Sequence, residues 1–488
     1  MQLRDLIRDV ELVEKVKFPA TEISGIAYDS RKVKAEHLFV AIEGTMTNGN
    51  HYVKQAMSLG ARAVLSENPK PKDFQWPWIQ VRRSRQALAQ TAANFHARPT
   101  RELRLVGITG TNGKTSIAYL LESILKATGA RVGLISTIEC RGPDWAVPSE
   151  HTTPESLDVQ ALLRRFCQGQ CRDVVMEVSS HALAMDRVYG CRFSVAVFSN
   201  LTPEHLDYHH SMDAYFEAKR RLFVDTGYGP PPIAIVNLDD SRGKILAKTS
   251  PGRPLTFSKS QPADFQVLEY RSGWDGIQVR FKLRGEELEV NTGLLGSFNL
   301  SNLLAAVAAA SCLGVAKDAL KRGIQKCSSI PGRFEEIDCG QAFHVIVDYA
   351  HTPDALQTVL RTARELLPRR VLVLFGCGGE RDRSKRPLMA SIAERWSDWV
   401  MLTSDNPRSE DPLAIIEEVQ AGFQSNRYTN EPDRSQAIRR ILLQATAGDV
   451  VILAGKGHEV QQELADQIRL FDDRQVARTV LRDMGYGD

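Results

Sequence analysis

The sequence predicts an α/β fold of about three domains built on largely parallel sheets. The chain has 488 residues, and roughly 150 residues per domain gives about three domains. Apolar runs with β character alternate with helical patterns along most of the chain, which is typical of parallel sheets. Hydrophobic residues make up 43% and charged residues 25% of the chain. This balance is that of a globular protein and excludes disorder of the whole chain.

The first hundred residues are expected to form one domain. Short apolar strands and helical stretches alternate there: strands at 38–42 and 61–65, helices at 52–59 and 85–95. Gly60 closes the first of these helices as a C-cap. Arg98-Pro99-Thr100 breaks the second. We therefore place the first domain at residues 1–98.

The middle of the chain begins with a strand, a glycine-rich turn and a long helix, at 105–108, 110–113 and 115–128. Further strands are expected at 132–135, 173–178, 195–198 and 233–236. Segment 253–291 alternates polar and apolar residues between glycine turns, which favours small antiparallel strands. An apolar helix at 300–313 completes the region, and Ile330-Pro331-Gly332-Arg333 marks its end. The second domain is placed at 99–332.

The last domain, 333–488, contains four predicted strands that are each followed by a polar or glycine-rich loop. These strands lie at 344–347, 371–375, 399–403 and 450–454. In open α/β sheets, ligands bind outside the carboxyl ends of the strands. The four loops carry Asp348 with His351, Arg381 with Asp382, Asp405 with Arg408, and Lys456 with His458 and Glu459. The sequence therefore predicts a binding site at this sheet edge.

Charge and apolar patterning exclude several classes of function. Lys and Arg total 62 against 59 Asp and Glu, a net charge of +3, so no global field attracts nucleic acid or an anionic membrane. Eight cysteines are too sparse for a disulfide scaffold and lack the pairing of a zinc finger. The charged start has no signal-peptide core, and the most apolar stretch, 303–316, is too short to span a membrane. We expect a cytoplasmic protein without membrane insertion or nucleic-acid partner.

The turn Gly110-Thr111-Asn112-Gly113-Lys114-Thr115 has the composition of a phosphate-binding loop. Its glycines let backbone N–H groups face phosphate oxygens, Lys114 supplies a cation, and the Thr115 hydroxyl can hold Mg²⁺. The strict pattern requires glycine where Ile108 stands, and Gly107 comes one residue too early. The turn is therefore interpreted as a variant phosphate loop, and the alternative is a glycine-rich turn without a ligand.

Four further positions are candidates with open alternatives. Glu177 ends a strand where an acid can approach Mg²⁺, although an acid at a strand end is more often solvated. His205 lies near two other histidines, but without thiolates or a second close pair it is a single metal or phosphate ligand rather than part of a zinc site. Lys219, by its pattern alone, is an exposed helical lysine. Asn299 and Asn302 either cap the apolar helix or reach a purine.

These motifs together resemble the Mur ligases, the ATP-dependent amide ligases of peptidoglycan precursor synthesis. The matching positions run along the whole chain in the family's order: Gly110–Thr115, Glu177 with Ser179-Ser180-His181, His205, Lys219, Gly296-x-Phe298-Asn299-x-x-Asn302, Pro331-Gly332-Arg333 and Asp348-Tyr349-Ala350-His351. The resemblance implies a three-domain Mur ligase architecture. Its central domain would hold a P-loop-type ATP-binding parallel sheet, and its C-terminal domain would be Rossmann-like.

The resemblance also implies ATP and Mg²⁺ as cofactors and assigns the residues that hold them. ATP would lie on Gly110, Thr111, Asn112, Gly113, Lys114, Thr115 and Ser116, with Asn299, Asn302, Arg333, Asp348 and His351 completing the nucleotide site. Lys114, Glu177, His205 and Lys219 would be catalytic. The metal ligands would be Thr115, Glu177, His205 and a carbamylated Lys219, since carbamylation turns a cation that repels Mg²⁺ into an oxygen ligand.

The second implied ligand is UDP-MurNAc-L-Ala-D-Glu. Tyr28, Ser30 and the loop Thr45-Met46-Thr47 would hold its UDP end, and Thr152, Thr153, Ser179 and Arg187 its muramoyl-dipeptide. His151 and Met185 belong to the same set but depart from relatives that have Asn and Gln there. The family's chemistry would transfer the γ-phosphoryl group of ATP to the D-glutamate γ-carboxylate, and an incoming amine would then displace phosphate.

The third implied ligand is the incoming amino acid. Tyr28-Asp29-Ser30-Arg31, Gly376 to Arg383, Asp405-Asn406-Pro407-Arg408 and Gly455 to Glu459 resemble the third ligase of the family. Within it, Asp405-Asn406-Pro407-Arg408 resembles the motif of members that add meso-2,6-diaminopimelate. A guanidinium fits the far-end carboxylate of that substrate, which L-lysine lacks. The implied contacts are Arg381, Asp405, Asn406, Pro407, Arg408, Gly455 and Glu459. An alternative for 405–408 is a capping turn before a helix at 412–423.

Other functions compatible with these motifs are the same ligase with L-lysine, a ligase that adds D-Ala-D-Ala, and a folylpolyglutamate-synthetase-like ligase. A non-catalytic nucleotide-binding scaffold is the alternative from a different class; it would keep the loop around Lys114 but need neither Arg381 nor Arg408. The protein is expected to be a monomer.

Overall fold

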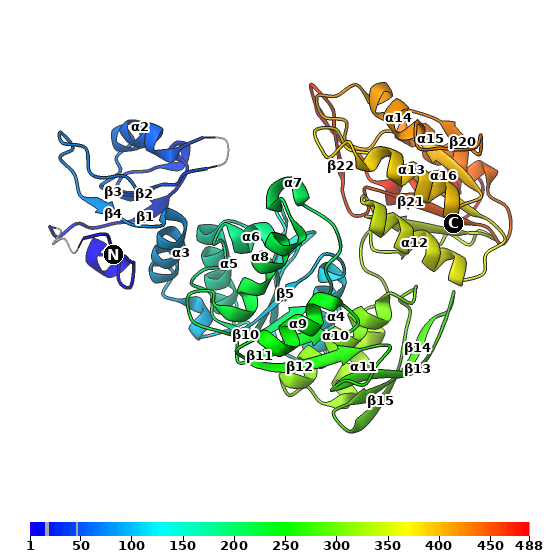
Figure 1. Ribbon diagram of the computed structural model, residues 1–488, viewed down its shortest axis with the longest axis horizontal. Helices are drawn as coiled ribbons and strands as arrows, with labels where there is room; N and C mark the ends of the chain where they lie inside the picture. Colours follow the sequence, from blue (N-terminus) through cyan, green and yellow to red (C-terminus); the bar gives the residue numbers. More distant parts are fainter. Residues whose placement is uncertain (15–18, 45–46, 488) are drawn as a thin grey trace.

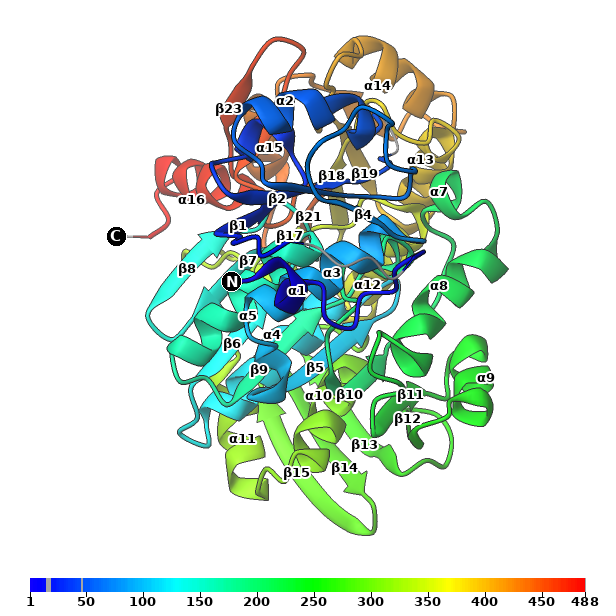
Figure 2. The ribbon, with the colours of Figure 1, turned by 90° about the vertical axis from the view of Figure 1, so that its left-hand side faces the viewer.

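A computed structural model describes residues 1–14, 19–44 and 47–487. Its strands form sheets of four, eleven and six strands and one two-stranded hairpin. The three larger sheets lie in three separate lobes that follow one another along the chain (Figure 1). Both views place the first and the last lobe over the same side of the middle lobe (Figure 2). The predicted α/β fold class is confirmed, while the domain boundaries at 98 and 332 stay predictions.

The first lobe is a small parallel sheet with helices packed against it. Its strands are β1 (Gly25–Ala27), β2 (His37–Ala41), β3 (Ala63–Ser66) and β4 (Trp78–Gln80), all in parallel register. Its helices are α1 (Leu3–Leu6), α2 (Val53–Ser58) and α3 (Ser84–Phe95), with 3₁₀ turns at Ser30–Lys32 and Gly49–Tyr52. The two predicted strands and two predicted helices are confirmed. Strands β1 and β4, of three residues each, are too short to give a period-2 pattern in the sequence.

The middle lobe is built on the eleven-stranded sheet, in the order β15-β14-β13-β12-β11-β10-β5-β9-β6-β7-β8. Its strands are β5 (Arg104–Thr109), β6 (Val132–Ile135), β7 (Glu139–Gly142), β8 (Trp145–Pro148), β9 (Asp173–Glu177), β10 (Phe193–Phe198), β11 (Ile233–Asn237), β12 (Arg253–Ser258), β13 (Phe265–Gly273), β14 (Gly276–Leu283) and β15 (Glu286–Thr292). All five strands predicted between 105 and 236 are present and lie parallel to one another.

The prediction of antiparallel strands for 253–291 is correct for β13 to β15 and wrong for β12. Strand β12 pairs in parallel with both β11 and β13 and so extends the parallel sheet. Its first two residues are exposed although it lies inside the sheet, and such a pattern does not distinguish a parallel from an antiparallel strand. The β7–β8 hairpin was not predicted, because its strands have only four residues each.

Helices cover both faces of the middle sheet. The buried core on one face includes α4 (Lys114–Lys126), α10 (Asn299–Cys312) and α11 (Lys317–Lys326). The core on the other face includes α5 (Ser156–Gln168) and α8 (Met212–Val224). The shorter helices are η3 (Pro99–Arg101), α6 (Ser180–Ala184), α7 (Leu206–His209) and α9 (Ser241–Thr249). Alternate residues of the strands therefore face the two cores, which explains their nearly continuous apolar sequences.

The last lobe contains a six-stranded sheet in the order β16-β17-β21-β18-β19-β20. Its strands are β16 (Glu335–Glu336), β17 (His344–Asp348), β18 (Val371–Phe375), β19 (Trp399–Leu402), β20 (Tyr428–Asn430) and β21 (Val450–Ala454), and the hairpin consists of β22 (Gln461–Glu463) and β23 (Ile468–Leu470). Its helices are α12 (Pro353–Glu365), α13 (Lys385–Trp396), α14 (Pro412–Gln420), α15 (Arg434–Gln444) and α16 (Asp473–Asp483). The four predicted strands are parallel neighbours, so their following loops meet at one edge. Within the described ranges, no helix combines the length and the apolar character needed to cross a membrane.

Candidate functional site

The phosphate loop joins β5 to α4 and is held by the start of α10. Helix α4 begins at Lys114, directly after Gly113, whose φ of 88° is left-handed. A side chain at position 113 would place its Cβ 2.3 Å from Asn302 Oδ1, so glycine is required both by the turn and by the contact. Asn302 is held in turn by the Asn299 side chain, 2.9 Å away. The two asparagines thus lie buried against the loop and do not cap α10 through their side chains.

Two lysines converge on one carbonyl of this loop. Lys114 Nζ donates to Gly110 O at 3.0 Å and to Thr111 O at 2.8 Å, and Lys219 Nζ donates to Gly110 O at 2.8 Å. The expectation of an exposed Lys219 is wrong: only 1% of the residue is exposed, because α8 packs this side against the core. Burial and the neighbouring Lys114 lower the pKa of Lys219 well below its ordinary value. This environment favours an uncharged amine.

Glu177 is fully buried, so the expectation of a solvated acid is also wrong. Its Oε2 accepts hydrogen bonds from Thr115 Oγ1 and Thr137 Oγ1, both at 3.0 Å, and its Oε1 accepts one from the Thr137 N–H at 2.9 Å. A buried carboxylate beside a phosphate-loop hydroxyl offers the hard oxygen donors that Mg²⁺ takes together with phosphate oxygens. The residues therefore fit this metal.

The remaining proposed metal ligands are not in contact with Glu177. His205 Nε2 lies 3.7 Å from Glu204 Oε2, and Lys219 contacts the loop carbonyl. In residues 1–14, 19–44 and 47–487, no three His, Cys, Asp or Glu side chains are grouped as a metal site. Thr115 and Glu177 are thus the pair that the fold brings together.

Glu204 is a site residue that the sequence did not predict. It lies between His205 and His351, whose Nε2 is 3.9 Å from Glu204 Oε1. Burial alone would raise the pKa of Glu204, but His205, Lys114 and His351 outweigh it and hold the pKa below its ordinary value. Glu204 gave no signal in the sequence, because the basic groups around it come from separate segments, including those of Lys114, His205 and His351.

The last lobe reaches the phosphate loop through several side chains. Arg333 Nη2 donates to Thr115 Oγ1 at 3.2 Å. Asp354, in the first turn of α12, accepts hydrogen bonds from Asn112 Nδ2 at 3.1 Å and Thr202 Oγ1 at 3.0 Å. These contacts place residues of the last lobe directly on the loop that is predicted to hold ATP.

Asp348, at the carboxyl end of β17, is a buried carboxylate with two backbone donors. Its Oδ2 accepts from the Phe334 N–H at 2.7 Å and its Oδ1 from the Ala350 N–H at 2.8 Å. Burial raises the pKa of Asp348 to about 6, against the opposing effects of Arg333 and these two N–H groups. A carboxylate kept ionised at a free-energy cost is typical of a functional site.

This pKa predicts a pH dependence of stability. An acid with a raised pKa in the folded state favours folding while it is protonated and disfavours folding once it ionises. Relative to Asp348→Asn, the free energy of unfolding of the unsubstituted protein should therefore fall by roughly 2 kcal/mol between pH 4 and pH 6. The full titration of this carboxyl accounts for roughly 3 kcal/mol, at 1.36 kcal/mol per pKa unit. Chemical denaturation of both proteins across this range measures it. A difference that does not change with pH would contradict the prediction.

The predicted UDP and dipeptide contacts fall into two groups. In the first lobe, Tyr28 OH donates to Asp158 Oδ2 of α5 at 2.9 Å and Ser30 Oγ to Gln55 Oε1 at 2.9 Å. Thr47 Oγ1 lies 3.2 Å from Tyr52 OH. Thr45 and Met46 lie outside the described residues.

The second group lies beside Glu177. Thr153 Oγ1 donates to Glu177 O at 2.9 Å and accepts from the Ser179 N–H at 3.1 Å, while Arg187 Nη1 donates to Thr153 O at 3.0 Å. Thr152 Oγ1 lies 3.1 Å from Thr137 Oγ1. Met185 Sδ lies 3.7 Å from Arg187 Nη2, and His151 is exposed. Apart from His151, this set is gathered around the buried acid.

The predicted amino-acid site lies on the loops after β18, β19 and β21. Asn406 Nδ2 donates to Glu459 Oε2 at 3.0 Å, and Lys456 Nζ donates to Asn406 Oδ1 and to Glu459 Oε2, each at 3.0 Å. Lys456, which is fully buried, thus connects two of the loops. Asp405 packs against Gly455, where an added Cβ would lie 2.6 Å from Asp405 Oδ2.

Arg408 is presented by a strained turn and not by a helix cap. Its φ is 54°, in the left-handed region that non-glycine residues rarely adopt. Asp411, not the 405–408 segment, caps α14 by accepting from the Leu413 N–H; the capping-turn alternative is therefore wrong. Arg381 is exposed and lies near Gly378, beside the Arg408 guanidinium.

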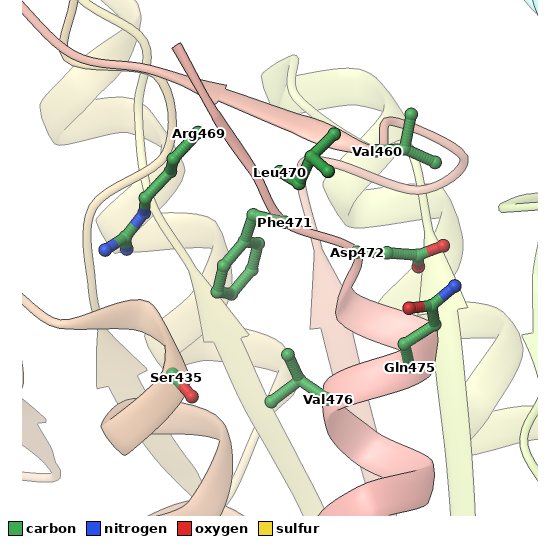
Figure 3. A pocket seen from close by; sticks show the side chains of 8 residues that line it. All are labelled: Ser435, Val460, Arg469, Leu470, Phe471, Asp472, Gln475 and Val476. Carbon is green, nitrogen blue, oxygen red and sulfur yellow. The ribbon is translucent and has the colours of Figure 1, made fainter. Parts of the chain in front are cut away.

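A cavity of about 370 Å³ lies in the last lobe, apart from these residues. Figure 3 shows the side chains of Leu470, Phe471 and Val476 around it, near the start of α16. None of the predicted site residues lines it. Its size alone does not identify it as the functional site, because the buried acids and cations lie elsewhere.

Three family models match the chain in order. The model described as "Mur ligase family, catalytic domain" matches residues 22–96, "Mur ligase middle domain" matches 108–310, and "Mur ligase, glutamate ligase domain" matches 332–457. These segments lie in the first, middle and last lobes.

Relatives and solved structures agree with these matches. The UDP-N-acetylmuramoyl-L-alanyl-D-glutamate–2,6-diaminopimelate ligase of Solibacter usitatus is 45% identical over 490 residues, covering 100% of this chain and 99% of the relative. A solved structure of a ligase of the same name is 31% identical, with a TM-score of 0.71, and covers 100% and 99% of the two chains. The Mycobacterium tuberculosis folylpolyglutamate synthase complexed with ADP and AMPPCP shares the fold, at 17% identity and a TM-score of 0.63, over 76% of this chain and 92% of that one.

Proposed function

Because the chain belongs to the Mur ligase family, we propose that it joins meso-2,6-diaminopimelate to the D-glutamate γ-carboxylate of UDP-MurNAc-L-Ala-D-Glu. It is an ATP-dependent ligase of peptidoglycan precursor synthesis. The observation that carries the proposal is the contact of Arg333 with Thr115 beside buried Glu177. This contact joins the lobe proposed to bind ATP to the lobe that carries Arg408.

ATP is proposed to lie on the phosphate loop with its phosphates toward Lys114 and the first N–H groups of α4. Lys114 would turn from the loop carbonyls toward the phosphates, and Asn302, Arg333 and Asp348 would surround the nucleotide. Thr115 and Glu177 would hold Mg²⁺, with His205 as a further ligand. When bound, Mg²⁺ supplies positive charge that stabilises the phosphoryl group during transfer.

Lys219 is proposed to be carbamylated. Its buried amine has a pKa well below the ordinary value, and an uncharged amine is the form that adds to carbon dioxide, releasing one proton and gaining a carboxylate. The uncharged amine on Gly110 O beside Lys114 would thereby be replaced by an anion that Lys114 stabilises. With ¹³C-labelled bicarbonate, we expect one carbamate NMR signal that is absent from Lys219→Met; a protein without this signal would refute the modification.

The remaining steps are the activation of the dipeptide carboxylate and its attack by the amine. Thr153, Ser179 and Arg187, beside Glu177, would orient the dipeptide so that its γ-carboxylate faces the ATP phosphates. A carboxylate is a poor electrophile, and its conversion to an acyl phosphate is the step that requires ATP. The amine of diaminopimelate then attacks the carbonyl carbon, and phosphate leaves. Docking of the last lobe on the phosphate loop would exclude water, which otherwise hydrolyses the acyl phosphate.

The choice of diaminopimelate is supported by the guanidinium groups of Arg408 and Arg381 at one edge of the last sheet. L-lysine lacks the far-end carboxylate and would leave Arg408 without that partner. The folylpolyglutamate-synthetase alternative has weaker support, since that fold match covers 76% of the chain at 17% identity. A monomeric and cytoplasmic protein remains our expectation from the sequence.

Phosphate release tests the proposed function directly. With ATP, Mg²⁺ and UDP-MurNAc-L-Ala-D-Glu, we expect phosphate to be released when meso-diaminopimelate is added and the tripeptide product to appear by mass spectrometry. Omission of the amino acid is the control. No release with any candidate amino acid would refute the ligase assignment, and faster turnover with L-lysine would refute the choice of substrate alone.

A further inference from the structure

The Arg408 guanidinium is fixed through two of its three nitrogens. Arg408 Nη1 donates to Gly379 O at 2.8 Å, and Arg408 Nε lies 2.8 Å from Glu463 Oε2. Among the residues that the structure describes, Nη2 has no protein acceptor. Nη1 uses one of its two N–H groups on Gly379 O. Its second N–H and the N–H groups of Nη2 therefore remain for a carboxylate, which a guanidinium binds through two parallel hydrogen bonds.

The backbone of Glu463 is tied to the same turn. Glu463 O accepts from the Arg408 N–H at 3.1 Å, and the Glu463 N–H donates to Asn406 Oδ1 at 3.1 Å. The preceding Gln462 donates through Nε2 to Asp405 O at 2.7 Å. Strand β22 is thus hydrogen-bonded to the 405–408 turn. These bonds hold the backbone of Glu463 in place beside Arg408.

The exposure of the Arg408–Glu463 ion pair argues against a mainly stabilising role. The side chains of Arg408 and Glu463 are 22% and 44% exposed, and ion pairs at such positions contribute little to stability. An arginine side chain has many rotamers, however, and a ligand that must immobilise it loses affinity. A partner that orients the guanidinium beforehand removes part of this cost.

We propose that Glu463 is a positioning residue of the amino-acid site, and that it holds Arg408 so that its Nη edge faces the far-end carboxylate of the substrate. The inference rests on the proposed function, since only a substrate with that carboxylate uses this edge. Glu463 contributes to selection of diaminopimelate over L-lysine without touching either molecule. The opposite role, in which Glu463 competes with the substrate carboxylate for Arg408, predicts the reverse change in KM.

The test compares Glu463→Ala and Glu463→Gln with Asp466→Asn, a matched control that removes one exposed acid from the same hairpin. For Glu463→Ala we expect KM for diaminopimelate to rise about three- to tenfold, the effect of one unfixed side chain, with kcat within about twofold. Turnover with L-lysine should not change. Glu463→Gln keeps an acceptor oxygen, so its KM for diaminopimelate should lie between those of Glu463→Ala and the unsubstituted protein. Asp466→Asn should have the KM of the unsubstituted protein.

A double-mutant cycle separates positioning from a merely structural role. In an Arg408→Ala background, Glu463→Ala should cause no further rise in KM, because the residue acts through Arg408. An unchanged or lowered KM in the single variants, or effects that simply add in the double variant, would overturn the inference. Failure of the unsubstituted protein to use diaminopimelate would instead refute the proposed function. Should Glu463→Ala not fold, Glu463→Gln alone decides the sign of the KM change.

Discussion

Lys114→Ala should abolish measurable turnover while the protein stays folded. Lys114 is the cation of the phosphate loop, and removal of one preorganised charge at a transition state lowers kcat by roughly a hundred- to a thousandfold. Among the described residues, its Nζ donates hydrogen bonds to the loop carbonyls of Gly110 and Thr111 alone, so few folding contacts are lost. The measurement is phosphate release under saturating substrates, together with thermal unfolding.

Lys126→Ala is the matched control, since Lys126 ends the same helix and its side chain is 44% exposed. This variant should retain full activity. Activity of Lys114→Ala close to that of the control would show that the loop does not act on the phosphates. It would favour the non-catalytic scaffold over the ligase.

Arg408→Ala should give the second largest effect, on diaminopimelate rather than on ATP. A hydrogen-bonded charge is worth roughly 1.5–3 kcal/mol, which corresponds to a loss of about 10- to 150-fold in kcat/KM for diaminopimelate. Alanine has the same Cβ as arginine and adds no strain at φ 54°, so folding should not suffer. Steady-state kinetics with diaminopimelate, L-lysine and ATP varied in turn would measure the loss.

The control for this variant is Arg439→Ala, which removes an exposed arginine of α15 paired with Asp483. Its kinetics should be those of the unsubstituted protein. If Arg408→Ala left both kinetic constants for diaminopimelate unchanged, the assignment of the 405–408 turn would be wrong. The Glu463 inference would lose its basis at the same time.

Part of the site could be predicted from the sequence because it depends on residues that are close together along the chain. The strand before Gly110 and the helix after Gly113 fix the phosphate loop within a few residues of one another. The loops after β17, β18, β19 and β21 were expected to meet because parallel strands present their carboxyl ends at one edge. Strand β12 was misread since its pairing partner, not its own pattern, decides its direction.

The sequence by itself determined many of the strands and helices, the place of the glycine-rich loop and which loops share a sheet edge, but not the short strands β1, β4, β7 and β8. Only the tertiary structure decided the environment of individual side chains. Their local patterns alone favoured solvated side chains for Lys219 and Glu177, which are buried. Glu204 and Glu463 gave no sequence signal. The physical reason is that secondary structure follows from neighbours along the chain. Burial, pKa and ion pairing are set by segments that folding brings from far away.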